Sequence, residues 1–133
     1  MILGINHMAI ASPDPQALAR FYTEILQLER IVLDPDAASV WLRAGTSILM
    51  IEDLSGSSRF TPAHPVNMAT KYHDRQPGFH ALIFAIEVDT FKSWKKRIES
   101  AGVQIEAHSA YSLYFRDPEK NRIGLSTYPQ LAG

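Results

Sequence analysis

The segments INHMAI (residues 5–10) and GFHALIF (residues 78–84) decide the fold, because each is a short apolar strand pattern that carries one histidine. An amphipathic helix pattern follows each segment. His7 and His80 lie 73 positions apart, and the segments WLR (41–43) and YFR (114–116) are separated by the same interval. A repeat of this kind predicts two copies of one structural unit that face each other across a shared site.

Length and composition limit the class of protein. The 133 residues, 46% of them hydrophobic, are enough for one domain with a core. The formal net charge of −1 predicts no general attraction to nucleic acid or to anionic membranes. No apolar run is long enough to cross a bilayer, the first residues lack a signal-peptide pattern, and there is no cysteine for disulfides or thiolate zinc sites. We therefore expect a cytoplasmic protein without a nucleic-acid or membrane partner.

Both halves show the same order of elements: strand, helix, strand, strand, strand. The first helix is expected to begin at Pro15 with Asp14 as its cap, and the second covers residues 90–101. The strand patterns cover residues 3–10, 30–33, 39–43, 46–52, 79–88, 103–107, 111–116 and 122–128. We expect a single domain (1–133) made of a first module (1–52), a connection (53–77) and a second module (78–130).

The segments FYTEILQLE (21–29) and FRDPEKNRI (115–123), together with the two histidines, resemble the vicinal oxygen chelate superfamily. That group includes glyoxalase I, extradiol dioxygenases, fosfomycin-resistance enzymes and bleomycin-resistance proteins. The resemblance spans almost the whole chain and implies an α+β fold. In this fold two βαβββ modules form a cupped, barrel-like mixed sheet, with helices on its outer face and a divalent metal ion in the cup. Because one fold can carry unrelated reactions, the resemblance predicts the fold better than the reaction.

The resemblance places metal ligands on the first and fourth strands of each half, and this chain keeps only part of that set. His7 and His80 match the first-strand ligands. Gly124 stands where the second-half glutamate belongs, and Met50 stands at the equivalent position of the first half. Hard divalent ions favour anionic oxygen ligands, so two imidazoles leave the metal charge uncompensated. Glu52, on the same strand face as Met50, is a candidate third ligand or base.

Strand alternation predicts which side chains line the cup. The expected face is mostly apolar with a few polar groups, which is typical of a ligand cavity. Glycine at position 124 removes bulk, so a ligand group is expected to occupy the space of the missing carboxylate. The residues expected on this face are His7, Ala9, Ile48, Met50, Glu52, His80, Leu82, Phe84, Arg122, Gly124 and Ser126.

Three functions remain open. In a metal-dependent lyase, isomerase or dioxygenase, His7 and His80 would hold Fe, Mn, Zn or Ni, and Glu52 would be a third ligand or base. In a metal-free enzyme, one histidine would transfer protons. In a resistance-type protein that sequesters its ligand, the metal-free cup would hold a partly aromatic molecule with His7, His80 and Arg122 as polar anchors. The aromatic residues considered for this third function are Trp41, Phe60, Phe84 and Tyr114.

We favour a small-molecule-binding cup with a degenerate metal site, and we leave open whether the protein is an enzyme. The residues expected to contact the ligand are Trp41, Met50, Phe84, Tyr114, Arg122, Gly124 and Ser126. Superfamily members of this size often dimerise, either by completing each cup between chains or by pairing whole cups. The resemblance therefore also implies a homodimer.

Overall fold

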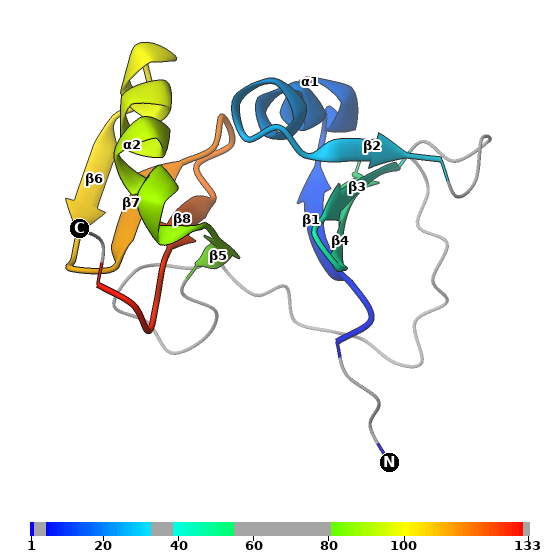
Figure 1. The fold of residues 1–133 in the computed structure, drawn as a ribbon. Coiled ribbons are helices and arrows are strands. Elements are labelled where there is room, and N and C mark those ends of the chain that lie inside the picture. The colour runs from blue at the N-terminus through cyan, green and yellow to red at the C-terminus, as the bar shows by residue number, and fades with distance from the viewer. Residues whose placement is uncertain (2–4, 33–38, 55–80, 132–133) are drawn as a thin grey trace, which may run out of the picture.

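The computed structural model describes residues 1, 5–32, 39–54 and 81–131. It has the α+β fold expected, with two modules that each contain one four-stranded sheet (Figure 1). Module 1 contains β1 (Met8–Ser12), α1 (Pro15–Arg20), η1 (Phe21–Ile25), β2 (Glu29–Ile31), β3 (Val40–Ala44) and β4 (Ser47–Asp53). Module 2 contains β5 (Leu82–Ala85), η2 (Val88–Thr90), α2 (Phe91–Ser100), β6 (Ile105–His108), β7 (Ser112–Arg116) and β8 (Arg122–Ser126).

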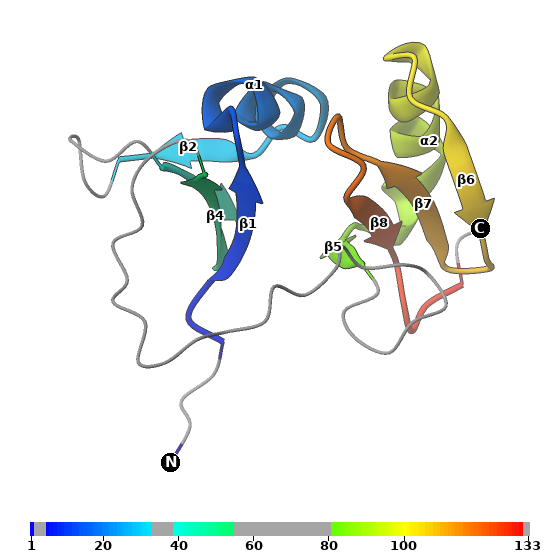
Figure 2. The same ribbon diagram turned by 180° about the vertical axis from the view of Figure 1, so that it is seen from behind.

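The two sheets have the same topology. Their strand orders are β1-β4-β3-β2 and β5-β8-β7-β6, with β1 parallel to β4 and β5 parallel to β8. The other neighbouring strands are antiparallel. The edge strands β1 and β5 lie at the inner sides of the two sheets (Figure 2). The sheets remain separate, so the described strands do not form a closed barrel.

The first helix begins as its sequence predicts. Pro15 occupies the first turn, and the Asp14 carboxylate accepts a hydrogen bond from the Ala17 amide at 3.1 Å. The helix then widens into the π-helical segment η1, where Phe21 and Tyr22 are buried. In the described part of the chain, no helix is long and apolar enough to cross a membrane.

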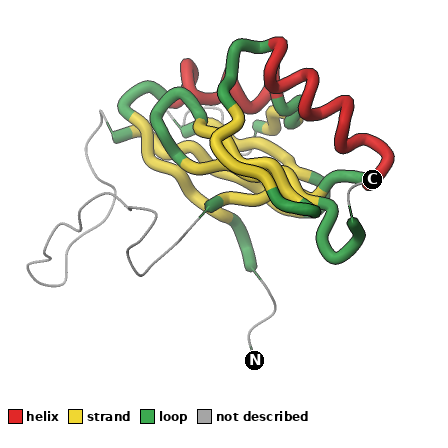
Figure 3. The backbone as a smooth tube through the Cα atoms, turned by 90° about the vertical axis from the view of Figure 1, so that its left-hand side faces the viewer, coloured by secondary structure: helices red, strands yellow, loops and turns green. Residues whose placement is uncertain are grey.

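One apolar core joins the two modules. The helices cover one side of the strands (Figure 3), where the side chains of the central strands are fully buried and those of the edge strands β1, β5 and β6 are partly buried. Burial of this apolar surface is the main stabilising term of the fold. The core residues are Leu18, Ala19, Phe21, Tyr22, Leu26, Val40, Leu42, Leu49, Ile51, Ile98, Phe115, Ile123 and Leu125.

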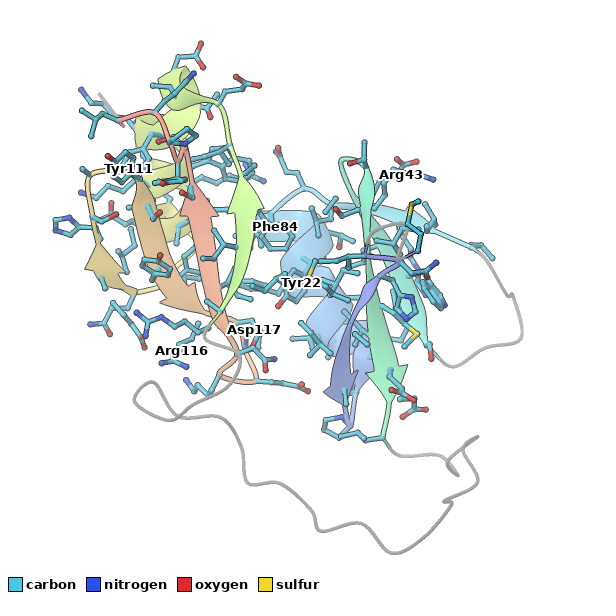
Figure 4. The ribbon with its side chains drawn as sticks, turned by 90° about the horizontal axis from the view of Figure 1, so that it is seen from below. Tyr22, Arg43, Phe84, Tyr111, Arg116 and Asp117 are labelled. Atoms are coloured by element: carbon cyan, nitrogen blue, oxygen red, sulfur yellow. The ribbon has the colours of Figure 1, made fainter. Side chains whose placement is uncertain are left out.

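A buried hydrogen bond crosses between the modules inside this core. The Tyr22 hydroxyl of η1 donates to Asp117 Oδ2 at 2.7 Å, and Asp117 is 2% exposed. The other carboxylate oxygen accepts the backbone amides of Glu119 and Asn121, both at 2.9 Å, and the Asn121 side chain donates to Oδ2. Asp117 therefore organises the turn between β7 and β8 and holds it against the first helix (Figure 4). These donors satisfy a buried charge that would otherwise be costly.

Two exposed or half-buried contacts support the same junction. The Ser12 hydroxyl at the end of β1 donates to the Glu119 carboxylate at 2.6 Å. Arg97 of α2 donates to the carbonyl oxygens of Ile25 and Glu24, both at 2.8 Å. A cation at the carboxyl end of a helix satisfies carbonyls that lack a partner within that helix. The second module thus completes the end of the first module's helix.

The substitution Tyr22→Phe is expected to lower the free energy of unfolding by about 1–3 kcal/mol, because it removes a donor from a buried carboxylate without changing ring packing. Urea unfolding followed by circular dichroism measures this loss. Tyr128→Phe is the matched control, since the Tyr128 side chain is 73% exposed. An unchanged midpoint for Tyr22→Phe would show that the inter-module hydrogen bond does not stabilise the fold.

The difference in stability between the wild type and Tyr22→Phe is also expected to depend on pH. Burial, and then the negative charge of Asp117, raise the pKa of Tyr22 well above its ordinary value. Tyr22 in the unfolded chain ionises near pH ~10. Above that pH the unfolded state releases a proton that the folded state retains, so stability falls as the pH rises. The stability advantage of the wild type over Tyr22→Phe should therefore shrink above pH ~10.

Candidate functional site

Each sheet has a helix-covered face and an open face, and strand register assigns the residues to them. In module 1, Trp41 pairs with Met50 and Ala9 pairs with Met50 on its other side. These residues alternate with the buried Leu42, Leu49 and Ile51, so they lie on the open face. Glu52 lies on the open face as well, two positions beyond Met50, and is half-buried. Ala9, Met50 and Glu52 therefore share one face, which strand alternation had predicted, and Trp41 joins them there.

His7 extends this face just before β1. Its ring lies 5.3 Å from the Trp41 ring in an edge-on arrangement, and its Nδ1 is 2.7 Å from the Asn6 side-chain oxygen. The residue is exposed. His7, Trp41 and Met50 therefore form a half-apolar surface with one imidazole on it.

The open face of module 2 differs from the prediction in its first strand. Ile83 pairs with Gly124, and Leu82 and Phe84 pair with the buried Ile123 and Leu125. Phe84 packs against the core, with its ring 6.4 Å from the Tyr22 ring (Figure 4). The expectation that Leu82 and Phe84 line the cup is therefore wrong, because the alternation in β5 starts one residue later than assumed.

Strand register identifies the residue of module 2 that is equivalent to His7. The first residue of β1, Met8, pairs with Leu49, and the first residue of β5, Leu82, pairs with Ile123. Because Met50 and Gly124 occupy equivalent positions, the counterpart of His7 in module 2 is Ala81. His80 itself lies outside the described residues.

The space beside Gly124 is occupied. A Cβ atom at this position would lie 3.0 Å from Cε1 and 3.1 Å from Cδ1 of Tyr114, and 3.1 Å from Cγ1 of Ile83. Glycine thus allows the Tyr114 ring to lie directly against the β8 backbone. The Tyr114 ring therefore fills the space directly beside the Gly124 backbone, and the expectation that a ligand group takes the place of the missing glutamate stays a prediction.

Two arginines and a tyrosine continue this surface. The Arg122 guanidinium lies over the Tyr114 ring, 4.9 Å from its centroid, in the geometry of a cation–π contact. Arg116 of β7, the strand partner of Arg122, forms an ion pair with Glu106 at 2.9 Å. Tyr114 and Arg122 were both expected at the site, and register places both on the open face of module 2.

A hollow of about 470 Å³ lies on the open face of module 2. Its lining combines aromatic rings, hydroxyl groups and small apolar side chains, as ligand pockets do. Sequence reasoning found Tyr114 and Ser126, and strand alternation puts Tyr128 on the face of Gly124. It missed Tyr111 and Ser112, although period-2 alternation from Tyr114 gives Ser112. The lining residues are Ile83, Ala85, Ser109, Tyr111, Ser112, Tyr114, Ser126 and Tyr128.

A larger hollow of about 640 Å³ lies at the start of α2, away from both open faces. Glu87, Asp89, Lys92 and Lys95 line it, and all four are exposed to solvent. Exposed charges of both signs are typical of a hydrated surface and bind a ligand weakly. The module 2 hollow is therefore the better candidate site.

The donor set for a metal is incomplete in the described residues. They contain no group of three or more histidine, aspartate or glutamate side chains placed to hold an ion. Gly124 and Ala81 have no side-chain ligand atom, and a side chain at position 124 would meet the Tyr114 ring at its Cβ atom. The chemistry of these residues does not fit the metal site that the superfamily implies.

The site residues that the structure describes form two groups. His7, Trp41, Met50 and Glu52 share the open face of module 1. Tyr114, Arg122, Gly124 and Ser126 share that of module 2. Both open faces point away from the common core, because the opposite side of each sheet belongs to it. One copy of the chain therefore presents two separate open faces that carry the predicted site residues.

The contact at Gly124 predicts a specific energetic coupling. Gly124→Ala should be more destabilising with Tyr114 present than in a Tyr114→Ala background, with a coupling energy of about 1 kcal/mol or more, because the added methyl group crowds the ring. Urea unfolding of the four proteins in the cycle measures it. A parallel cycle with Tyr111→Ala, which does not contact Gly124, is the control. Equal coupling in both cycles would show that the Tyr114 ring does not lie against Gly124.

Comparisons with known proteins agree with this fold. A search of curated protein sequences finds no match. Among solved structures, one from the mobile metagenome of V. pseudocholerae is 19% identical, with a TM-score of 0.73 over 98% of both chains. Lactoylglutathione lyase from Agrobacterium tumefaciens is 22% identical, with a TM-score of 0.65 over 94% of this chain and 93% of that chain.

A mutant of the fosfomycin resistance protein FosX from Listeria monocytogenes, complexed with Mn(II) and 1S,2S-dihydroxypropylphosphonic acid, is 17% identical. Its TM-score is 0.68, over 96% of this chain and 91% of that chain. At these identities the likeness establishes the fold alone. The family model of the glyoxalase/bleomycin resistance protein/dioxygenase superfamily matches residues 4–125. The chain belongs to the glyoxalase/bleomycin resistance protein/dioxygenase superfamily.

Proposed function

We propose that this protein binds a small organic molecule on the open face of module 2, without the carboxylate-held metal of its superfamily. The observation that carries the proposal is the Tyr114 ring packed on Gly124, because it replaces an ion ligand with an aromatic wall. The adjoining hollow of about 470 Å³ has the size and the mixed lining of a small-molecule site. Whether the bound molecule is also transformed depends on groups that this face does not identify.

The proposed site is completed by a second copy of the chain. In one copy, Ile83 is 45% exposed on the open face of module 2, and Ala85 beside it is exposed too. Module 1 offers an equally open, half-apolar face with His7, Trp41 and Met50. Both faces of one copy turn away from its core, so a homodimer can pair module 1 of one copy with module 2 of the other. This arrangement would enclose the ligand between two sheets.

A metal-dependent lyase, isomerase or dioxygenase is the second candidate. Its support is the position of His7, whose ring is exposed on the open face that also carries the half-buried Glu52. The proposed binding function does not require a metal ion bound by His7 and Glu52. Titration with Mn²⁺, Zn²⁺ or Ni²⁺ separates the candidates, because stoichiometric binding that disappears in His7→Ala would favour the metal-dependent one.

The binding function is tested by screening a library of small fragments against the wild type, using ligand-observed NMR. We expect hits whose affinity falls at least tenfold in Tyr114→Ala, because the aromatic wall of the site is removed. The variant Trp94→Phe, on the helix side of module 2, is the control for nonspecific effects of changing an aromatic side chain outside the site. Hits that bind wild type and Tyr114→Ala equally would place the ligand elsewhere.

The dimer is tested by mixing Trp41→Ala and Tyr114→Ala chains, refolded together, with a hit from that screen. If each cup joins two copies, about a quarter of the cups in a random mixture contain both wild-type faces, because half of the dimers are mixed and each has one intact cup. Binding should recover to that level although neither variant binds alone. No recovery, or a monomer in sedimentation equilibrium, would contradict the shared cup.

A further inference from the structure

We propose that the module 2 site selects planar aromatic molecules that carry a hydrogen-bond acceptor oxygen, such as aromatic carboxylates, quinones and aryl ketones. This inference rests on the proposed binding function and specifies its ligand class. Two independent observations support it: the arrangement of aromatic rings around the hollow, and the hydrogen-bonding state of the serine hydroxyls in its wall.

Three tyrosines from separate parts of module 2 surround the hollow. Tyr114 lies on β7, Tyr111 precedes that strand, and Tyr128 follows β8. Tyr111 and Tyr128 pack edge to face, with their ring centroids 5.2 Å apart. Tyr114 is held by contact with Gly124 and by the guanidinium of Arg122 above it. Rings fixed in this way give the hollow a preorganised aromatic wall, and a ligand with a planar π system can pack against it edge to face or offset-stacked.

The hydroxyl of Ser126 lies beside this aromatic surface and has donor capacity left. Its oxygen accepts a hydrogen bond from the Ser112 hydroxyl at 2.8 Å and another from the Tyr128 amide at 3.1 Å. A serine oxygen has two lone pairs, so both are engaged and its own proton remains to be donated. In the opposite assignment, with Ser126 donating to Ser112, the Ser112 proton is left instead. Either assignment gives the pair one hydroxyl donor for a ligand.

Ser109 repeats this pattern at the rim of the hollow. Its oxygen accepts the backbone amides of Tyr111 and Ser112, both at 3.1 Å, which again leaves the hydroxyl proton. The lining residues include neither aspartate nor glutamate. The described wall therefore presents donors beside aromatic rings, and a ligand with an acceptor oxygen satisfies them. A ligand that has only donor groups leaves these hydroxyls without an acceptor.

The test uses three probes of similar size and isothermal titration calorimetry on the full chain. The first is 2-naphthoate, which has a planar π system and acceptor oxygens. The second is decahydro-2-naphthoate, which has the same carboxylate and charge but no π system. The third is 2-(aminomethyl)naphthalene, which has the π system and, as the ammonium ion, only donors. We expect 2-naphthoate to bind at least tenfold more tightly than either of the others.

Variants locate the effect in the wall of the hollow. The double variant Ser112→Ala/Ser126→Ala removes the hydroxyl donor of the pair in either assignment, so it should weaken 2-naphthoate binding about five- to tenfold and 2-(aminomethyl)naphthalene binding less. Tyr114→Leu should weaken the binding of both aromatic probes. Tyr114→Phe should bind both as the wild type does, because it keeps the ring. Ser93→Ala on α2 is the matched control, since its hydroxyl bonds within its own helix. Thermal unfolding of each variant verifies that it is folded.

The outcomes separate this inference from the function on which it rests. If decahydro-2-naphthoate or the ammonium probe binds as tightly as 2-naphthoate, the ligand class is wrong and the binding function stands. The same conclusion follows if 2-naphthoate fails to bind while other fragments bind in a Tyr114-dependent manner. If no fragment binds in that manner, both the ligand class and the proposed binding function are overturned.

Discussion

The hydrogen bond from Tyr22 to Asp117 is the constraint on which the arrangement of this molecule depends. Burial favours the neutral phenol, and the carboxylate needs its donor, so each group requires the other inside the core. Because one group belongs to the first helix and the other to the turn between β7 and β8, the bond fixes module 2 against module 1. The same docking leaves the opposite faces of both sheets open, and these faces carry the candidate site.

The site illustrates how a superfamily position can change its chemistry without a change of fold. At Gly124, loss of the side chain allows the ring of the neighbouring strand to settle on the backbone. The backbone at Gly124 thereby becomes part of an aromatic wall, with a guanidinium over the ring. Such a substitution removes an attraction for hard cations and adds one for flat organic molecules. The remaining strands need not move to accommodate this change.

Most of the fold could be predicted from the sequence, because periodicity and caps are local. Asp14 and Pro15 gave the start of the first helix, and the apolar alternation of β4 and β8 assigned their faces correctly. The face of β5 could not be assigned in this way. Every residue from 81 to 86 is apolar, so the sequence does not show which of them face the core. A constant interval between the halves was then assumed, and it placed Phe84 on the wrong face.

The interval is not constant because two segments differ in length between the modules. Ala9 and Ile83 hold equivalent places in β1 and β5 and are 74 positions apart, so the chain from β5 to β7 is one residue shorter than the chain from β1 to β3. The hairpins that follow differ in the opposite sense. Four residues separate Arg43 from its partner Ile48, whereas five separate Arg116 from Arg122. Trp41 and Tyr114 are therefore 73 positions apart, while Met50 and Gly124 are 74 apart. The longer turn in module 2 is the one that contains Asp117. The contact of Tyr114 with Gly124 could not be predicted from the sequence either, because it depends on the side-chain conformation of Tyr114.

The contacts of Arg97 affect how the chain folds during synthesis. The carbonyl groups of Glu24 and Ile25 receive their donors from a residue made more than seventy positions later. While the ribosome has produced only the first half, that helix ends without its guanidinium cap, and Tyr22 lacks its carboxylate acceptor. The nascent first half is therefore an incomplete folding unit. Its helix reaches full stability only once the second half has emerged and docked.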